Sequence, residues 1–208
     1  MTIQKFSKKE AISFGWQITK SNFWFFVGLL ILAGIIRVGP NLIKELLKEK
    51  SPGLSFLIDL IGLVLSLIIV LGLIKISLNF CDNLKSEIFD LFSQYRLVFR
   101  YLFAFILYVL ICSLGLIFFI IPGIYFGIRF IFFDYFIVDK ESKIIESLRK
   151  SWQITKGSVW NLFLFYLLLV GINLLGAICL FIGLFATIPT TMIARAFVYR
   201  KLLSQSET

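Results

Sequence analysis

Histidine is absent from this 208-residue chain, and cysteine is scarce. Without histidine the chain lacks the commonest proton shuttle, general base and metal ligand of proteins. The three cysteines, Cys81, Cys112 and Cys179, are far apart and have no metal-ligand spacing, so we interpret them as small apolar residues. We therefore expect neither a metal ion nor another cofactor.

Catalytic motifs are also missing from the sequence. It contains no glycine-rich phosphate loop and no nucleophile motif. The polar segments are too short to enclose a substrate pocket. We expect that the protein is not an enzyme.

Charged residues are also scarce in this chain. Charged residues make up 16% of the chain, whereas a soluble domain contains about a quarter. Hydrophobic residues reach 59%, and 24 of them are Phe. No polar run is long enough to build a separate soluble core, so we expect residues 1–208 to form a single integral membrane domain.

The charges that are present are mostly positive, with 21 Lys and Arg against 12 Asp and Glu. A basic balance is typical of nucleic-acid-binding proteins, but no separate basic domain is available for that role. Cationic loops also orient membrane helices and contact anionic headgroups. We expect the partner of these charges to be the lipid bilayer and not nucleic acid.

The longest uncharged run predicts a helical hairpin in lipid. Residues 157–194 contain no charge, and these 38 residues are about twice the roughly 20 that cross a bilayer core. The turn of this hairpin is predicted near Gly183. Four further spans are predicted over residues 23–39, 54–80, 101–121 and 124–138, with a tight turn at Pro122-Gly123. The expected fold is an all-α polytopic transmembrane helical bundle with about six spans.

The distribution of basic residues predicts the orientation of these spans. The first outer loop holds four of the 21 Lys and Arg, and Arg129 and Arg195 lie inside spans, which leaves 15 on the side of the termini. The positive-inside rule then places both termini in the cytoplasm.

The five-residue word Trp-Gln-Ile-Thr-Lys occurs twice, at residues 16–20 and 152–156. At the same offset of 136 residues Trp24 aligns with Trp160. A fainter match at offset 61 aligns the Pro122 turn with Gly183. We predict three repeats of an amphipathic helix followed by a transmembrane hairpin, over approximately residues 1–80, 81–138 and 139–208. Even numbers of spans make such repeats parallel.

Tryptophan and lysine side chains mark the predicted membrane interfaces. Indole rings favour the boundary between acyl chains and water, and lysine amines reach the headgroups. These residues are interpreted as interfacial anchors, with a lipid-headgroup site as the alternative: Trp16, Lys20, Trp24, Trp152, Lys156 and Trp160.

Residues 114–203 carry a set of short motifs: Ile-Pro-Gly-Ile-Tyr at 121–125, Arg129, Ser-Leu-Arg-Lys-Ser-Trp at 147–152, Thr-Lys-Gly at 155–157, Pro189 and Ala-Phe-Val-Tyr-Arg at 196–200. With these motifs the segment resembles a bacterial family of six-helix integral membrane proteins. Related membrane domains precede some glycerophosphodiester phosphodiesterase domains. The first hundred residues match loosely. The resemblance implies residence in the bacterial cytoplasmic membrane and no established activity, since the phosphodiesterase's catalytic domain is absent.

Four ionisable residues fall inside the predicted spans: Asp59, Arg129, Asp134 and Arg195. Such groups are costly in lipid, so they mark either pairing or function. Counted from the outer turns at about 1.5 Å per residue, Asp59 matches Arg129 in depth and Asp134 matches Arg195. We predict these two pairs. They are either structural or part of a polar path for a substrate or proton.

Two functions fit these features. The first is a membrane scaffold or accessory protein that organises lipid or a partner protein, for which tight turns and interfacial helices suffice. The second is a small-molecule or lipid transporter that uses the intramembrane charge pairs. A membrane protein partner and a homo-oligomer are both compatible with the sequence.

Overall fold

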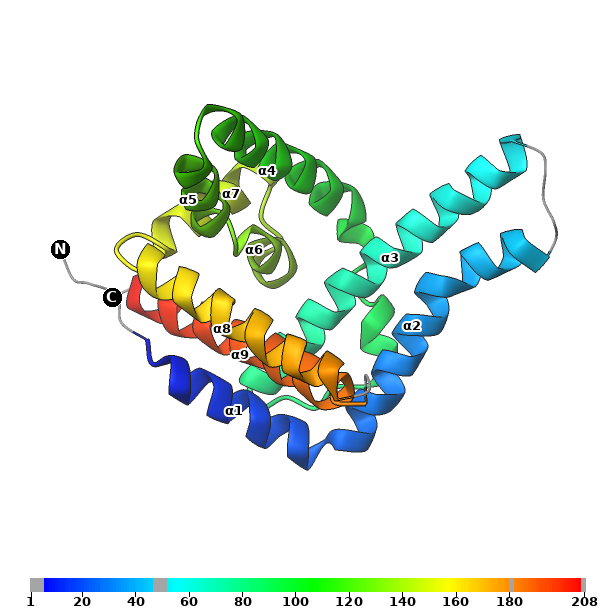
Figure 1. Ribbon diagram of the computed structural model, residues 1–208, viewed down its shortest axis with the longest axis horizontal. Coiled ribbons are helices and arrows are strands. Elements are labelled where there is room, and N and C mark those ends of the chain that lie inside the picture. The colour runs from blue at the N-terminus through cyan, green and yellow to red at the C-terminus, as the bar shows by residue number, and fades with distance from the viewer. Residues whose placement is uncertain (1–5, 47–51, 180–181, 207–208) are drawn as a thin grey trace.

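The computed structural model describes residues 6–46, 52–179 and 182–206, and within these ranges the chain forms helices and no strand. Figure 1 shows three helical hairpins that extend in different directions from a common centre. The α-helices are α1 (Lys8–Ser21), α2 (Phe23–Leu46), α3 (Pro52–Cys81), α4 (Val98–Phe118), α5 (Ile120–Arg129), α6 (Phe133–Lys140), α7 (Ile144–Ile154), α8 (Val159–Ile178) and α9 (Leu184–Ser206). The predicted all-α helical bundle is confirmed.

Helix α1 lies antiparallel along α9 (Figure 1). Its start is fixed by Ser7, whose hydroxyl accepts the Glu10 amide at 3.2 Å. Glycine permits the close approach of the two helices, because a Cβ at Gly15 would lie 2.3 Å from the Thr190 carbonyl oxygen. The buried face of α1, formed by Ala11, Gly15 and Thr19, packs on a helix of the bundle.

Helices α2 and α3 form the first hairpin. The sequence predicts a break at residues 39–41, but α2 continues through Pro40 to Leu46, so this prediction is wrong. Proline removes one backbone hydrogen bond from a helix, and neighbouring helices compensate for this in membrane proteins. Here Pro40 lies against Gly62 of α3, where a Cβ would come within 3.1 Å of the proline ring.

The segment between α3 and α4 differs from the amphipathic helix with which the second repeat, from about residue 81, is predicted to begin. It forms two short 3-10 helices, η1 (Ile88–Phe92) and η2 (Tyr95–Leu97), before α4 begins at Val98. Asp90 accepts the Glu87 amide at 2.9 Å and its carbonyl accepts the Ser93 hydroxyl, so side chains and turns satisfy the backbone here. Leu91 is fully buried against α3 at Gly72, which ties the segment to the bundle.

The second hairpin turns earlier than the sequence predicts. The break lies at Phe119, whose backbone is extended, and Pro122 and Gly123 lie within the first turns of α5. Proline is tolerated in the first turn of a helix because its missing N–H would have no partner there. Gly123 instead serves close packing, since a Cβ would lie 2.4 Å from Leu116 of α4.

The predicted fourth span is divided into α5 and α6 at residues 130–132. Helix α7 explains this break. Ser151 and Thr155 both donate hydroxyl hydrogen bonds of 3.0 Å to the Arg129 carbonyl, and the Phe132 amide donates to Ser151 at 3.1 Å. The backbone groups that lose their helical partners at this break are thus hydrogen-bonded to the hydroxyls of Ser151 and Thr155 instead of to water.

Helices α8 and α9 form the third hairpin, and Gly183 lies in its turn as predicted. Among the described residues, five segments are long and apolar enough to cross a membrane: Phe23–Glu45, Pro52–Cys81, Ile88–Ile117, Ile120–Lys140 and Val159–Ile178. Helix α9, predicted as the sixth span, is not among them. It packs against α1, α3 and α8, and its polar residues Thr190 and Thr191 are buried by protein.

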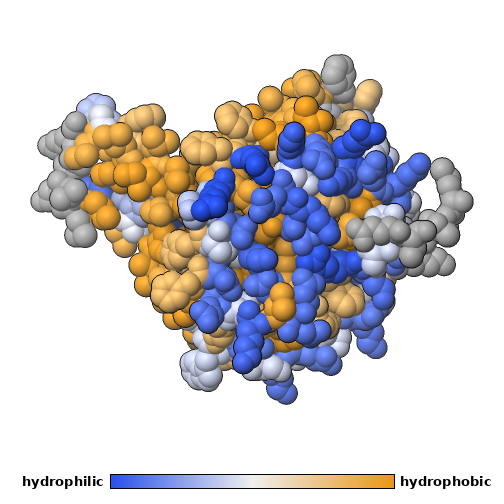
Figure 2. All heavy atoms as spheres, turned by 180° about the vertical axis from the view of Figure 1, so that it is seen from behind, coloured by the Kyte–Doolittle hydropathy of each residue, from blue (hydrophilic) through white to orange (hydrophobic). Residues whose placement is uncertain are grey.

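The surface separates into polar and apolar regions. Figure 2 shows hydrophilic side chains gathered on one part of the face it views, bordered by hydrophobic surface. Large apolar side chains are exposed along the hairpins, for example Phe56, Ile117 and Leu174. A soluble monomer rarely exposes such continuous apolar surface, and acyl chains provide its natural contact.

Candidate functional site: the charged centre of the bundle

Asp134 and Arg195 lie together in the bundle, as the sequence predicts. Their side chains approach to 3.7 Å between Arg195 Nη2 and Asp134 Oδ2. Asp134 also accepts the amide of Tyr135 at 2.9 Å, and the Arg195 Nε donates to the Tyr166 hydroxyl at 3.2 Å. The carboxylate and the guanidinium therefore have both an opposite charge and neutral polar partners, as charges away from water require.

A second cluster of charges, which the sequence analysis did not find, is centred on Arg200. The guanidinium binds Asp139 through two hydrogen bonds of 2.7 and 2.8 Å and Asp82 through one of 2.6 Å. The Tyr199 hydroxyl donates to Asp139 at 3.1 Å. This fork geometry is the strong form of an arginine–carboxylate pair. It joins the ends of α3, α6 and α9, one from each hairpin.

Aromatic rings connect the two clusters. The rings of Tyr135 and Tyr199 lie 5.1 Å apart, and the Arg195 guanidinium lies 5.8 Å from the Tyr135 ring. Tyr135 and Tyr199 are almost fully buried. Polar and aromatic groups thus run continuously through the core from Asp134 to the Arg200 cluster.

The predicted pair of Asp59 with Arg129 is wrong. Arg129 is only 3% exposed, and within the described residues its guanidinium has no carboxylate within 4 Å. It stacks on Trp152 at 3.9 Å from the ring centroid, with Tyr125 at 5.8 Å. A guanidinium binds an aromatic face through the ring quadrupole, and this attraction strengthens away from water. Depth counting failed because α5 ends at Arg129 and turns it toward α7.

Asp59 pairs with Lys44 across the α2–α3 hairpin. The Asp59 side chain is largely exposed, so this ion pair lies on the outside of the bundle. The sequence analysis placed Lys44 in a loop after residue 39, and the continuation of α2 brings it opposite α3.

The predicted interfacial anchors occupy different environments. Trp24 and Trp160 are largely exposed, Trp16 is 50% exposed, and the amines of Lys20 and Lys156 belong to exposed residues. Trp152 is partly covered because it stacks on Arg129 and Phe130. The two copies of the repeated word therefore place their tryptophans differently.

Outside the spans, the start of α7 is held by Glu146. Its carboxylate accepts the Lys143 amide at 3.3 Å and contacts the Lys150 amine at 2.7 Å. The hydrogen bond from Lys150 lowers the pKa of Glu146 below its ordinary value, with further contributions from Lys143. The carboxylate therefore stays ionised and stabilises the helix N-terminus.

The apolar helices, the exposed apolar surface and the enclosed charges define an integral membrane protein of the all-α, polytopic class. Residues 100–202, about half of the chain, match the family model described as the membrane domain of glycerophosphoryl diester phosphodiesterase, and the chain is therefore related to that domain. The resemblance stated from the sequence is confirmed. No curated protein and no solved structure matches the chain.

Proposed function

We propose that the protein is a scaffold or accessory protein of the bacterial cytoplasmic membrane, which organises lipid or a partner protein and catalyses no reaction. The observation that carries this proposal is the neutralisation of two central arginines, Arg195 and Arg200, by carboxylates, while the third, Arg129, is held by the Trp152 ring. Arg200 is satisfied by Asp82 and Asp139, and Arg195 by Asp134 and Tyr166. Charges satisfied in this way hold helices in register and bind no substrate.

The proposal includes three repeated units, and the packing supports it. The first helix of each predicted repeat packs on the second helix of a hairpin that belongs to another repeat or precedes it in the chain. Helix α1 packs on α9, η1 packs on α3, and α7 packs on α5 and α6. Positions 136 residues apart are also buried alike: Ala11, Gly15 and Thr19 in α1, and Ser147, Ser151 and Thr155 in α7. Such a cyclic arrangement would make a stable platform for lipid or a partner protein.

The proposed orientation has both termini in the cytoplasm. Glu10 at the start of α1 and Lys201 near the end of α9 lie 3.9 Å apart, so the two ends of the described chain are neighbours. The excess of basic residues on that side supports its cytoplasmic location. Cysteine labelling at Ser13 and Ser204 in whole cells tests this, since both positions should react only after the membrane is permeabilised.

A transporter of a small molecule or lipid is the alternative. The observation that favours it is the continuous run of polar and aromatic groups from Asp134 to Arg200, because such chains line proton and substrate paths in transporters. On this alternative, Asp134 would change partners during transport.

Native mass spectrometry of the protein, extracted together with its surrounding lipid, separates the two functions. For an accessory protein we expect a stoichiometric protein partner, or a defined oligomer, retained equally by wild type and by Asp134→Asn. A small molecule retained by wild type and lost from a folded Asp134→Asn variant would overturn the proposal in favour of transport. Lys85→Gln, an exposed change outside the clusters, is the control.

A further inference from the structure

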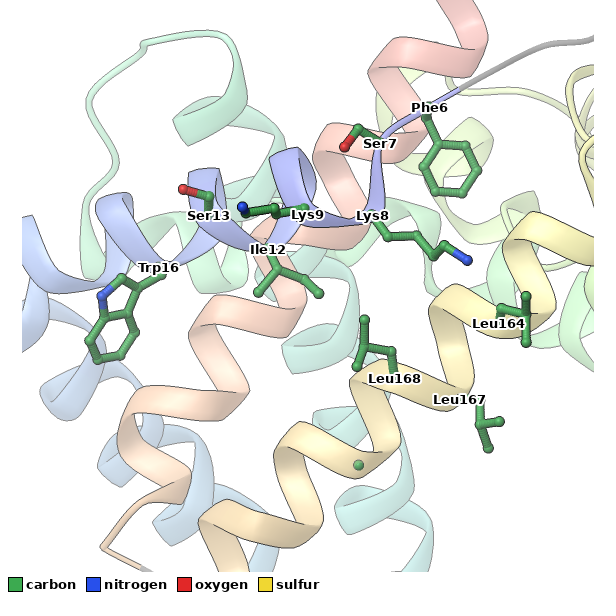
Figure 3. A pocket seen from close by; sticks show the side chains of 11 residues that line it. Phe6, Ser7, Lys8, Lys9, Ile12, Ser13, Trp16, Leu164, Leu167 and Leu168 are labelled. Atoms are coloured by element: carbon green, nitrogen blue, oxygen red, sulfur yellow. The ribbon is translucent and has the colours of Figure 1, made fainter.

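A wide groove runs between α1 and α8. Its volume is about 1140 Å³, more than the roughly 300–1,000 Å³ of sites for drug-sized molecules. Figure 3 shows Ile12 of α1 and Leu168 of α8 on its walls, with Trp16 towards one end. Leu164 and Leu167 extend the apolar wall along α8. The groove is open along its length, as a site for a chain entering sideways from the bilayer must be.

The cationic lining of the groove lies at the start of α1, and Ser13 is a further polar residue along the α1 wall. Ser7, Lys8 and Lys9 line the groove at this start of α1. Within the described residues, neither lysine amine has a carboxylate within 4 Å. The nearby Glu10 instead contacts Lys201 of α9. Figure 3 shows the Lys8 amine directed toward α8 and the Lys9 amine directed along α1 toward Ser13, so two cations without a counter-ion flank this part of the groove.

We propose that this groove binds one anionic phospholipid, with its phosphate at Lys8 and Lys9 and an acyl chain between α1 and α8. The charge of the groove selects an anion, because each lysine contributes about 1 kcal/mol of attraction to an anionic lipid surface. The apolar walls select a ligand with a long hydrocarbon chain, since a free phosphate would leave them without a partner.

Gly171 gives the groove its depth at the apolar end. Its position lines the groove, and a Cβ there would have no atom within 4 Å. A larger residue at this position would therefore fill the groove without disturbing the packing of α8. This offers a test by steric blocking, independent of the lysines.

The site differs from the interfacial residues of the repeated word, because Lys20 and Lys156 do not line it. It also goes beyond the accessory role proposed above. A bound lipid is compatible with a scaffold or with a transporter, so the outcome of the partner experiment does not decide this one.

The test measures lipid retention by native mass spectrometry of protein reconstituted with equal amounts of phosphatidylglycerol and phosphatidylcholine that carry identical acyl chains. We expect one phosphatidylglycerol to be retained by wild type. Because two lysines together supply about 2 kcal/mol, Lys8→Gln/Lys9→Gln should weaken this retention roughly 10–30-fold. Lys85→Gln/Arg149→Gln removes the same charge from exposed positions elsewhere and should leave retention unchanged.

Two further measurements test whether the bound ligand is a whole phospholipid. Gly171→Phe should reduce retention while Lys8 and Lys9 remain, since the acyl chain loses its place. Soluble glycerol phosphate at millimolar concentration should not displace the lipid. Equal retention of both lipids, equal effects of the two double variants, no effect of a folded Gly171→Phe variant, or displacement by glycerol phosphate would each overturn the proposal.

Discussion

Removing the Asp139 carboxylate should destabilise the bundle far more than removing that of Asp82, although both bind Arg200. Asp139 accepts three hydrogen bonds, two from Arg200 and one from Tyr199, and its side chain is 12% exposed. Asp82 accepts one hydrogen bond from Arg200 and is 36% exposed. Breaking a buried pair costs about 3–5 kcal/mol, while exposed pairs contribute about 0–1 kcal/mol.

Arg200 is itself 26% exposed, so we place the cost of Asp139→Asn near the lower end, at about 3 kcal/mol. For Asp82→Asn we expect less than about 1 kcal/mol. A chain of this size loses about 2–4 °C in Tm per kcal/mol, which corresponds to roughly 6–12 °C for Asp139→Asn.

The assay is thermal unfolding of the purified protein in one detergent, followed by tryptophan fluorescence, for both variants side by side. Arg200→Lys serves as a geometric control, because lysine keeps the charge and loses the fork that binds both oxygens of Asp139. It should fall between the two aspartate variants. If Asp139→Asn unfolds at or above the Tm of Asp82→Asn, the cluster does not join the hairpins as described.

Two further variants test the packing described above. Gly15→Ala should destabilise by about 1–2 kcal/mol, because its Cβ would overlap the Thr190 carbonyl, whereas Gly34→Ala, with open space at its Cβ, should stabilise slightly; a stabilised Gly15→Ala in thermal unfolding would contradict the helix contact. Trp152→Ala should cost about 3 kcal/mol because it leaves the Arg129 guanidinium without its aromatic partner, and Trp16→Ala, at the equivalent and half-exposed position, should cost less than about 1 kcal/mol. Equal losses in the two tryptophan variants, measured by the same unfolding assay, would refute the stacking argument.

The sequence indicates the class of fold because segments that lie in lipid must be long, apolar and uncharged, and these properties can be seen in the sequence itself. Uncharged runs of more than 20 residues have one stable conformation in a bilayer, and the helices follow them closely. The start of α1 is also readable, since Ser7 and Glu10 form a local capping pattern. These features depend on neighbouring residues and need no knowledge of tertiary contacts.

The remaining features depend on contacts between distant segments. Pro40 indicates a break by local rules, yet it lies inside α2, where it packs against Gly62 of α3. The interruption after Arg129 requires the hydroxyls of Ser151 and Thr155, which arrive from α7. No local pattern predicts this.

Of the charged centre, too, one part could be predicted from the sequence and the rest could not. Asp134 and Arg195 were paired correctly, although the break at residues 130–132 lies between Asp134 and the turn from which its depth was counted. Arg129 was misassigned since its helix ends at that residue. The Arg200 cluster was missed because Asp82, Asp139 and Arg200 are far apart in the chain and only the packing of α3, α6 and α9 brings them together.

The most direct test of the structural role of the central charges is a charge swap at Asp134 and Arg195, read out as the Tm of protein purified from membranes. We expect Asp134→Arg and Arg195→Asp each to lower the Tm and the yield strongly. The double variant should recover a substantial part of both, because the 3.7 Å contact can form in reverse. Single variants as stable as wild type, or a double variant no better than the worse single one, would contradict the account.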